Sequence, residues 1–228
     1  TALPGLLSAS PASKVIMAST LTQRNANISM EAMQKGASDY LAKPSASSQE
    51  DLDNFYRDLT QKIEALGQHK KSVLVEEKTS ATSQGITLLD KTYHPIHAIA
   101  IASSTGGPQA LTQFFESLGT QTDHLPIFIT QHMPPTFTTV LAEQIGIKSN
   151  LQSAEGSEGD IVTPGHVYVA PGDYHMIPER SGTNIVIRLN RSEKINFCRP
   201  AADPMLEALA NVYGKNLLTI VLTGMGQD

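Results

Sequence analysis

The sequence has little of what marks several common protein classes. It contains a single cysteine, Cys198, so no disulfide can form within the chain, and one free thiol fits a reducing compartment. No apolar run reaches the roughly 18 residues that a membrane span needs, and the first residues lack the charged and apolar regions of an export signal. We therefore expect a cytoplasmic protein that does not insert into a membrane.

Excess positive charge and metal-ligand spacing are missing as well. The net charge is −5, whereas nucleic-acid-binding domains are usually basic, so no nucleic-acid partner is expected. No cluster of histidine and cysteine has the spacing of a metal site, so we expect no metal and no cofactor.

The second half of the chain alternates between strand and helix patterns. Apolar runs predict three strands; helical spacing predicts three helices; and shorter strands fall within 160–191. The strands are 96–102, 127–130 and 217–222, and the helices are 106–118, 137–145 and 201–213. This alternation predicts an α/β fold with a doubly wound, mainly parallel sheet covered on both faces.

The first 67 residues form a separate, shorter α/β pattern. Strands are expected at 14–19 and 40–42, and helices at 28–35 and 49–66. A polar stretch with weak periodicity follows and predicts a linker. The predicted division is therefore 1–67, a linker over 68–94, and a larger domain over 95–228.

Three polar residues follow predicted strands of the larger domain: Ser104, His132 and Asp228. In parallel sheets, sites form beyond the carboxyl ends of the strands. A serine needs an imidazole to take its proton and a carboxylate to orient that imidazole, so the three residue types have a joint use as a catalytic triad. Backbone N–H groups at the start of helix 106–118 could stabilise an oxyanion.

The same residues allow other interpretations. Ser104 could be only a helix N-cap, and the glycine-rich turn after it could cradle a phosphate or nucleotide. The turn lacks both the Lys-Ser/Thr ending of a P-loop and GxGxxG spacing. A non-catalytic signalling adaptor that keeps the fold is a further alternative.

A run of longer motifs carries a specific resemblance. In order, SSTGGPQAL, QHMPPTFTTVLAEQ, VYVAPGDYHM, CRPAAD and VLTGMGQD resemble the catalytic domain of chemotaxis protein-glutamate methylesterases, the CheB family. The resemblance implies a serine hydrolase that demethylates glutamate γ-methyl esters on chemotaxis receptors and deamidates receptor glutamines. It also implies that the chain stops short of the family's C-terminal elements.

The resemblance assigns roles to individual residues. Ser104 is the nucleophile, His132 the base and Asp228 the carboxylate that orients it. Thr105 and Met225 supply backbone donors to the oxyanion, and Arg199 and His175 line the substrate cleft. The family usually has Gly-Ala where this chain has Ala102-Ser103, and we expect Ser103 to be structural.

The N-terminal motifs VIMAST and GASDYLAKP resemble the last third of a response-regulator receiver domain, which has a flavodoxin-like fold. By this resemblance Ser19 is the switch hydroxyl, Tyr40 the switch aromatic and Lys43 the lysine that contacts the phosphoryl group. The early strands and the phosphoacceptor are missing from this piece. In the intact family protein, a chemotaxis histidine kinase phosphorylates the receiver, which otherwise covers the active site.

Overall fold

The structure is a computed structural model that describes residues 2–44, 49–67, 94–224 and 226–228. The predicted linker, 68–94, lies outside the described residues except for its last position. Within the described ranges, no helix combines the length and apolar character needed to cross a bilayer.

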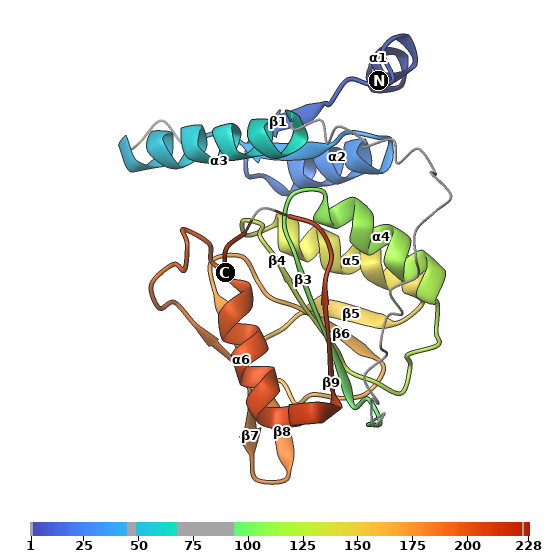
Figure 1. Cartoon of the computed structure of the whole chain (residues 1–228), viewed down its shortest axis with the longest axis vertical. Helices are drawn as coiled ribbons and strands as arrows, with labels where there is room; N and C mark the ends of the chain where they lie inside the picture. Colours follow the sequence, from blue (N-terminus) through green and yellow to red (C-terminus); the bar gives the residue numbers. More distant parts are fainter. Residues whose placement is uncertain (1, 45–48, 68–93, 225) are drawn as a thin grey trace, which may run out of the picture.

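A five-stranded parallel sheet forms the centre of the larger part, in the order β5-β6-β4-β3-β9 (Figure 1). The predicted α/β architecture with a mainly parallel sheet is thus confirmed. Its strands are β3 (Ala98–Ser103), β4 (Ile127–Gln131), β5 (Gln152–Glu155), β6 (His166–Val169) and β9 (Leu217–Val221). All residues of β3 and β4 are buried, as expected for central strands covered on both faces.

Helices cover both faces of this sheet, and alternate residues of β3 point into two different cores. Ile99 and Ile101 pack with α4 (Gly107–Leu118) and α5 (Phe137–Ser149). Ala98 and Ala100 pack with α6 (Ala202–Tyr213) and the antiparallel hairpin of β7 (His175–Ser181) and β8 (Asn184–Asn190). A short 3₁₀ helix at Gly214–Asn216 then leads into β9.

The N-terminal part contains two parallel strands and three helices. These are α1 (Leu3–Ala9), β1 (Ile16–Ser19), α2 (Gln23–Gln34), β2 (Asp39–Ala42) and α3 (Gln49–Gly67). The strand and helix patterns predicted here are present, although α1 was not expected.

The N-terminal part packs directly against α4 and α5. Apolar residues of α2, among them Met30 and Met33, belong to the same buried cluster as Val140 of α5. Tyr40 stacks on Phe137 with ring centroids 4.4 Å apart. The two parts therefore share one continuous core along this seam.

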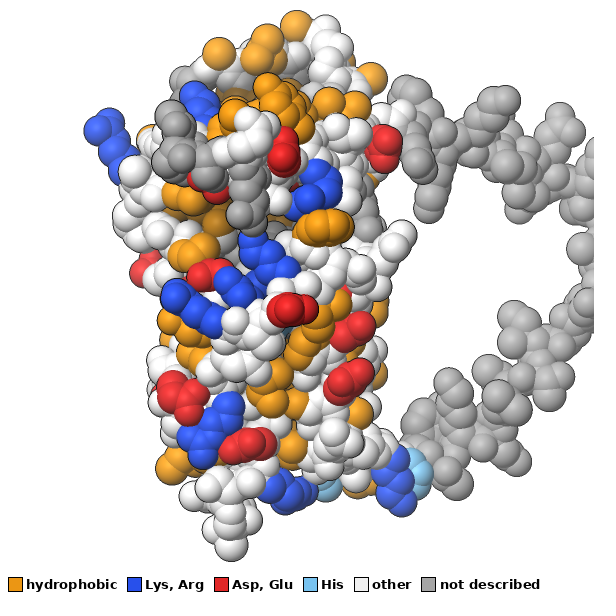
Figure 2. All heavy atoms as spheres, turned by 90° about the vertical axis from the view of Figure 1, so that its left-hand side faces the viewer, with side chains coloured by type: hydrophobic (Ala, Val, Ile, Leu, Met, Phe, Trp, Pro, Cys, Tyr) orange, Lys and Arg blue, Asp and Glu red, His pale blue; other side chains and the backbone are white. Residues whose placement is uncertain are grey.

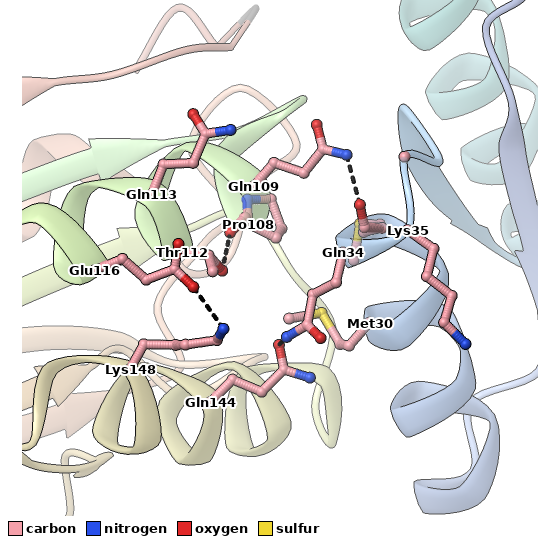
Figure 3. Close-up of a pocket in the computed structure, with 12 residues that line it drawn as sticks. Met30, Gln34, Lys35, Pro108, Gln109, Thr112, Gln113, Glu116, Gln144 and Lys148 are labelled. Atoms are coloured by element: carbon pink, nitrogen blue, oxygen red, sulfur yellow. Dashed lines mark hydrogen bonds and ion pairs between the residues drawn. The ribbon is translucent and has the colours of Figure 1, made fainter. Parts of the chain in front are cut away.

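A pocket of about 560 Å³ lies in the seam between α2 and helices α4 and α5 (Figure 3). Its polar side chains are largely paired with one another. Gln109 donates to the carbonyls of Met33 and Ala37, Gln34 donates to Gln144, and Lys148 pairs with Glu116. The bonds of Gln109 and Gln34 link the N-terminal part to α4 and α5, whereas the Lys148–Glu116 pair joins α5 to α4. None of the three predicted triad residues lines the pocket.

Candidate active site

Ser104 lies in the tight turn between β3 and α4. Its N–H donates to the carbonyl of Thr223 at 2.8 Å, which ties the turn to the segment after β9. Gly224 passes so close that a Cβ there would stand 2.5 Å from Cβ of Ser104, and its φ is +156°. This close approach explains the glycine, because any side chain would displace the predicted nucleophile.

His132 follows β4 and lies beside Ser104, since β3 and β4 are neighbours in the parallel sheet. The hydroxyl of Ser104 is 3.2 Å from Nδ1 of His132. The other ring nitrogen, Nε2, is 2.9 Å from Oδ2 of Asp228. The structure thus brings the three predicted residues into one hydrogen-bonded row.

Asp228 is held from a second direction. Its Oδ2 also accepts a hydrogen bond of 2.6 Å from the backbone N–H of Ala202, the first residue of α6. A carboxylate at a helix N-terminus is stabilised by the free N–H groups and the helix dipole. Although burial opposes ionisation, the hydrogen bond and charge of His132 and the N–H of Ala202 lower the pKa of Asp228.

The row fixes the tautomer of His132. Because Asp228 is ionised, it accepts from Nε2–H, which leaves Nδ1 as the acceptor for the Ser104 hydroxyl. Burial of the imidazole disfavours its charged form, but hydrogen bonds and charge from Asp228 and Cys198 outweigh burial and raise the pKa of His132 to about 9. When His132 is neutral, the row can accept a proton from serine, and Asp228 stabilises the imidazolium that results.

Cys198 is a second neighbour of Nδ1, with its Sγ 3.5 Å away. The donor atoms of His132, Cys198 and Asp228 lie within 4.8 Å of one another, which raises the question of a metal site. Within this cluster Cys198 contacts Nδ1 of His132 and Asp228 contacts Nε2, so each ring nitrogen has a hydrogen-bonding neighbour. The three side chains are potential metal ligands that the spacing in the sequence did not indicate.

The predicted oxyanion donors are only partly described. Thr105 is buried next to Ser104, and its carbonyl accepts from the hydroxyl of Thr223 at 3.0 Å. Gly106 follows with φ +75° and begins α4 without a side-chain cap, so Ser104 is not the N-cap of this helix. Met225 lies outside the described residues.

The cleft role predicted for His175 is not supported. Its side chain is fully buried, and both ring nitrogens bond to backbone: Nε2 to the carbonyl of Glu193, and Nδ1 to the N–H of Ala201. His175 instead braces the segment that carries Ala202, which in turn holds Asp228. A sequence motif places such a residue near a site but does not say which way its ring points.

Arg199 is likewise committed to internal contacts. It donates to Asp173 through Nε and Nη2, and to the carbonyls of Arg191 and Ser192 through Nη1. Its side chain is 17% exposed. The guanidinium thus joins the turn before β7 to the loop after β8 and stabilises both. Because most of its N–H groups are used in these contacts, few remain to bind a substrate.

The three residues assigned to the receiver switch lie on the two short parallel strands or directly after them. Ser19 ends β1, exposed Lys43 directly follows β2, and the N–H of Lys43 donates to the carbonyl of Ser19 at 2.7 Å. Tyr40 lies apart from them, buried against Phe137. Burial also raises the pKa of Tyr40 well above its usual value.

Sequence reasoning did not single out Gln131, Cys198 and the N–H of Ala202, which all contact the row or its backbone. Gln131 had a usable signal, because it ends a buried strand directly before His132. Cys198 and Ala202 both lie in the CRPAAD motif that carries part of the family resemblance, but only the tertiary fold shows that they reach the triad.

Comparison with known proteins places these features in a family. The model of the CheB methylesterase family matches residues 99–228, more than half of the chain. The chain belongs to the CheB methylesterase family. The crystal structure of the Thermotoga maritima CheB methylesterase catalytic domain is similar at 38% identity with a TM-score of 0.56, covering 59% of this chain and 71% of that one.

Curated CheB relatives match over the whole chain. Proteins named protein-glutamate methylesterase/protein-glutamine glutaminase 1 from Paramagnetospirillum magneticum and Rhodospirillum rubrum are 45% and 44% identical over 251 residues. A relative named protein-glutamate methylesterase/protein-glutamine glutaminase 2 from Caulobacter vibrioides is 42% identical over 228 residues. The chain spans 65% of the length of each of these relatives.

Proposed function

We propose that this chain carries a protein-glutamate methylesterase that also acts as a protein-glutamine glutaminase, with Ser104, His132 and Asp228 as its catalytic triad. The observation that carries the proposal is the hydrogen-bonded row of 3.2 Å and 2.9 Å through the two nitrogens of His132. Membership of the CheB family and the names of the relatives support a glutamate γ-methyl ester as the proposed substrate, and the resemblance of the sequence motifs supports a chemotaxis receptor as the protein that carries it. A cytoplasmic location belongs to the same proposal.

The row supports acyl transfer in two stages. Ser104 Oγ attacks the ester carbonyl carbon while its proton passes to Nδ1 of His132, and the C=O electron pair moves to the oxygen as an oxyanion. Collapse of this intermediate breaks the bond to the methoxy oxygen, which takes the proton from His132 and leaves as methanol. The product of this stage is an ester between Ser104 and the glutamate side chain.

Water completes the cycle by the same route. His132 takes a proton from water, the hydroxide attacks the acyl-enzyme carbonyl, and the serine oxygen leaves with the proton that His132 returns. The products are free glutamate and regenerated Ser104. With a glutamine substrate the leaving group is ammonia, and the remaining steps are the same.

Backbone N–H groups at the start of α4, with Thr105 the first after the nucleophile, are proposed to stabilise the oxyanion. Helix N-termini present free donors, and donors of this type contribute roughly 100- to 1,000-fold in comparable hydrolases. Met225 is the second donor in this proposal.

For residues 1–67 we propose the C-terminal part of a receiver domain, with Ser19, Tyr40 and Lys43 as its switch residues. The parallel β1–β2 pair, with Ser19 and Lys43 at its carboxyl end, supports this assignment. Asp39 is paired with Lys62 inside the fold, so it is not a candidate phosphoacceptor. A chemotaxis histidine kinase is the proposed partner of the intact receiver.

Arg57 of α3 lies over the ring of Phe197, 3.7 Å from its centroid, in the loop that carries Cys198. The side of the molecule that carries α3 and the hairpin β7–β8 shows basic side chains near its middle, mixed with acidic and apolar ones (Figure 2). A contact between the N-terminal part and the site loop agrees with a receiver that influences the active site.

Labelling with a fluorophosphonate probe tests the proposed nucleophile. The protein should be labelled, and Ser104→Ala should abolish labelling. Ser117→Ala, an exposed serine on α4, is the matched control and should be labelled like the parent. Methanol release from a methylated receptor then tests the substrate class. If Ser104→Ala is labelled as strongly as the parent, the proposed triad is wrong.

A further inference from the structure

A buried glutamine connects the backbones of the nucleophile and the base. Gln131 ends β4 and pairs in register with Ser103, which ends β3. Each of these residues directly precedes one member of the proposed triad, Ser104 or His132. Both side chains are buried, with Gln131 only 2% exposed.

The carboxamide of Gln131 uses all of its polar groups within the site. Its Oε1 accepts from the hydroxyl of Ser103 at 2.7 Å. Its Nε2 donates to the carbonyl of Ser104 at 2.9 Å and, at 3.4 Å, to the carbonyl of His132. One planar amide thus spans the two residues whose side chains must stay within hydrogen-bonding distance.

The orientation of this amide is determined by its partners. If the group were turned over, Oε1 would face the two carbonyl oxygens of Ser104 and His132, and acceptors would oppose acceptors. The Ser103 hydroxyl donates to the oxygen in the observed orientation and so reinforces it. The residue that replaces the family's usual alanine therefore has a specific partner.

The space for the amide is provided by Gly107. A Cβ at this position would stand 1.8 Å from Oε1 of Gln131 and 2.8 Å from its Cδ. Because no positive φ accompanies Gly107, the reason for glycine here is the space that the carboxamide occupies. The first turn of α4 is thus built around Gln131.

We propose that Gln131 is a positioning residue that holds the backbones of Ser104 and His132 at the separation needed for proton transfer, and that Ser103 fixes its orientation. This inference rests on the proposed function, since it assigns Gln131 to the same reaction. Gln131 touches no reacting atom. Displacement of a reacting group by about 1 Å can cost about 100-fold in rate, so a small backbone shift is enough for a large effect.

The test is Gln131→Met, which keeps the length of the side chain and removes both donors and the acceptor. We expect kcat for ester hydrolysis to fall about 10- to 100-fold while KM stays within about 2-fold, since the bridge acts on geometry and not on substrate binding. The rate of fluorophosphonate labelling should fall in parallel. Gln131→Glu should also be slow, and the ratio of its rate to the parent's should rise as pH falls, because only the protonated carboxyl can donate to a carbonyl.

Gln109→Met is the matched control. Gln109 also donates through Nε2 to two backbone carbonyls, those of Met33 and Ala37, but at the seam between α2 and α4. This variant should keep the kcat of the parent. If the loss of any buried amide bridge were enough to slow the enzyme, Gln109→Met and Gln131→Met would be slowed to the same extent.

A crystal structure of Gln131→Met gives a readout that does not depend on esterase activity. The distance between Ser104 Oγ and His132 Nδ1 should lengthen beyond hydrogen-bonding range. A parent that is not labelled at Ser104 would count against the proposed function, while the crystallographic distance would still decide the role of Gln131. A folded Gln131→Met protein with an unchanged distance and a parent-like labelling rate would overturn the inference.

Discussion

The thiol of Cys198 lies 3.5 Å from Nδ1 of His132, the same nitrogen that faces the hydroxyl of Ser104 at 3.2 Å. One imidazole nitrogen therefore has two potential donors, and the neutral ring can accept fully from only one of them. Cys198 also contributes to the raised pKa of His132, after the hydrogen bond to Asp228. This relationship makes Cys198 a regulator of how basic His132 is.

Cys198→Ala should lower the pKa of His132 below its value of about 9, because a hydrogen bond and a charge that favour the imidazolium are removed. A general base must be unprotonated to act, so the labelling rate of Ser104 should reach half its maximum at a lower pH than in the parent. The measurement is the rate of fluorophosphonate labelling between pH 6 and pH 10 or so. Cys198→Ser, whose hydroxyl oxygen can still accept from the imidazolium but carries no charge, should have a midpoint between those of the parent and Cys198→Ala; identical midpoints for all three proteins would contradict this interpretation.

Asp228→Asn should reduce esterase turnover by about 10,000-fold, the loss seen when a triad aspartate is replaced by asparagine. An asparagine oxygen can still accept from Nε2–H, but the imidazolium that forms during the reaction loses its counter-charge. Asp203→Asn is the control, since it removes an exposed carboxylate from the first turn of α6 and should leave turnover within about 2-fold. Turnover in the Asp228 variant within about 10-fold of the parent would remove Asp228 from the triad.

The pair of His132 and Asp228 also predicts how stability depends on pH. The pKa of His132 rises from 6.5 to about 9 on folding. Its contribution to the free energy of unfolding is therefore fully present below pH 6.5 and is lost as pH rises toward 9. A shift of this size corresponds to about 3 kcal/mol at most. Folding lowers the pKa of Asp228, so its contribution to the free energy of unfolding is present above the usual carboxyl pKa and is lost as pH falls.

Thermal unfolding of the parent and His132→Gln at a series of pH values measures this dependence. The parent should have the higher Tm at pH 6, and the difference should shrink steadily toward pH 9 and above. A difference in Tm that stays constant over this range would mean that the ion pair contributes no pH-dependent stability.

Much of the fold was predictable because the strongest signals are local. The apolar runs of β3, β4 and β9 and the strand-end positions of Ser104 and His132 follow from periodicity and from the topology of parallel sheets. β5 was missed because its sequence, QSAE, is polar; it is a half-buried edge strand with no apolar run. α1 was missed because Pro-Gly near its start indicates a turn.

The site was less predictable wherever roles depend on tertiary contacts. Spacing could suggest that a serine, a histidine and an aspartate meet, but not that His175 turns its ring toward the N–H of Ala201. Nor could it show that Ala202 donates to Asp228 across 26 positions of sequence. Such contacts join distant segments and leave no periodic pattern.

The N-terminal part contains a buried ion pair whose loss should be costly. Lys62 of α3 lies 2.9 Å from Oδ2 of Asp39, and their side chains are 10% and 2% exposed. Oδ1 of Asp39 accepts from the N–H of Tyr40, so the carboxylate is well satisfied. Asp39→Asn would leave the ammonium of Lys62 with only the half-exposed carboxylate of Asp58, 3.5 Å away, as a counter-charge.

We therefore expect Asp39→Asn to lower the free energy of unfolding by about 3 kcal/mol, because breaking a buried pair leaves one desolvated charge behind. Glu31→Gln is the control: it breaks the exposed pair with Lys35 on α2, and exposed pairs contribute little to stability because water screens them. Urea unfolding of both variants measures the two losses on the same scale. Equal losses would mean that water reaches Lys62 as freely as it reaches Lys35, and that the ion pair does not hold α3 against β2.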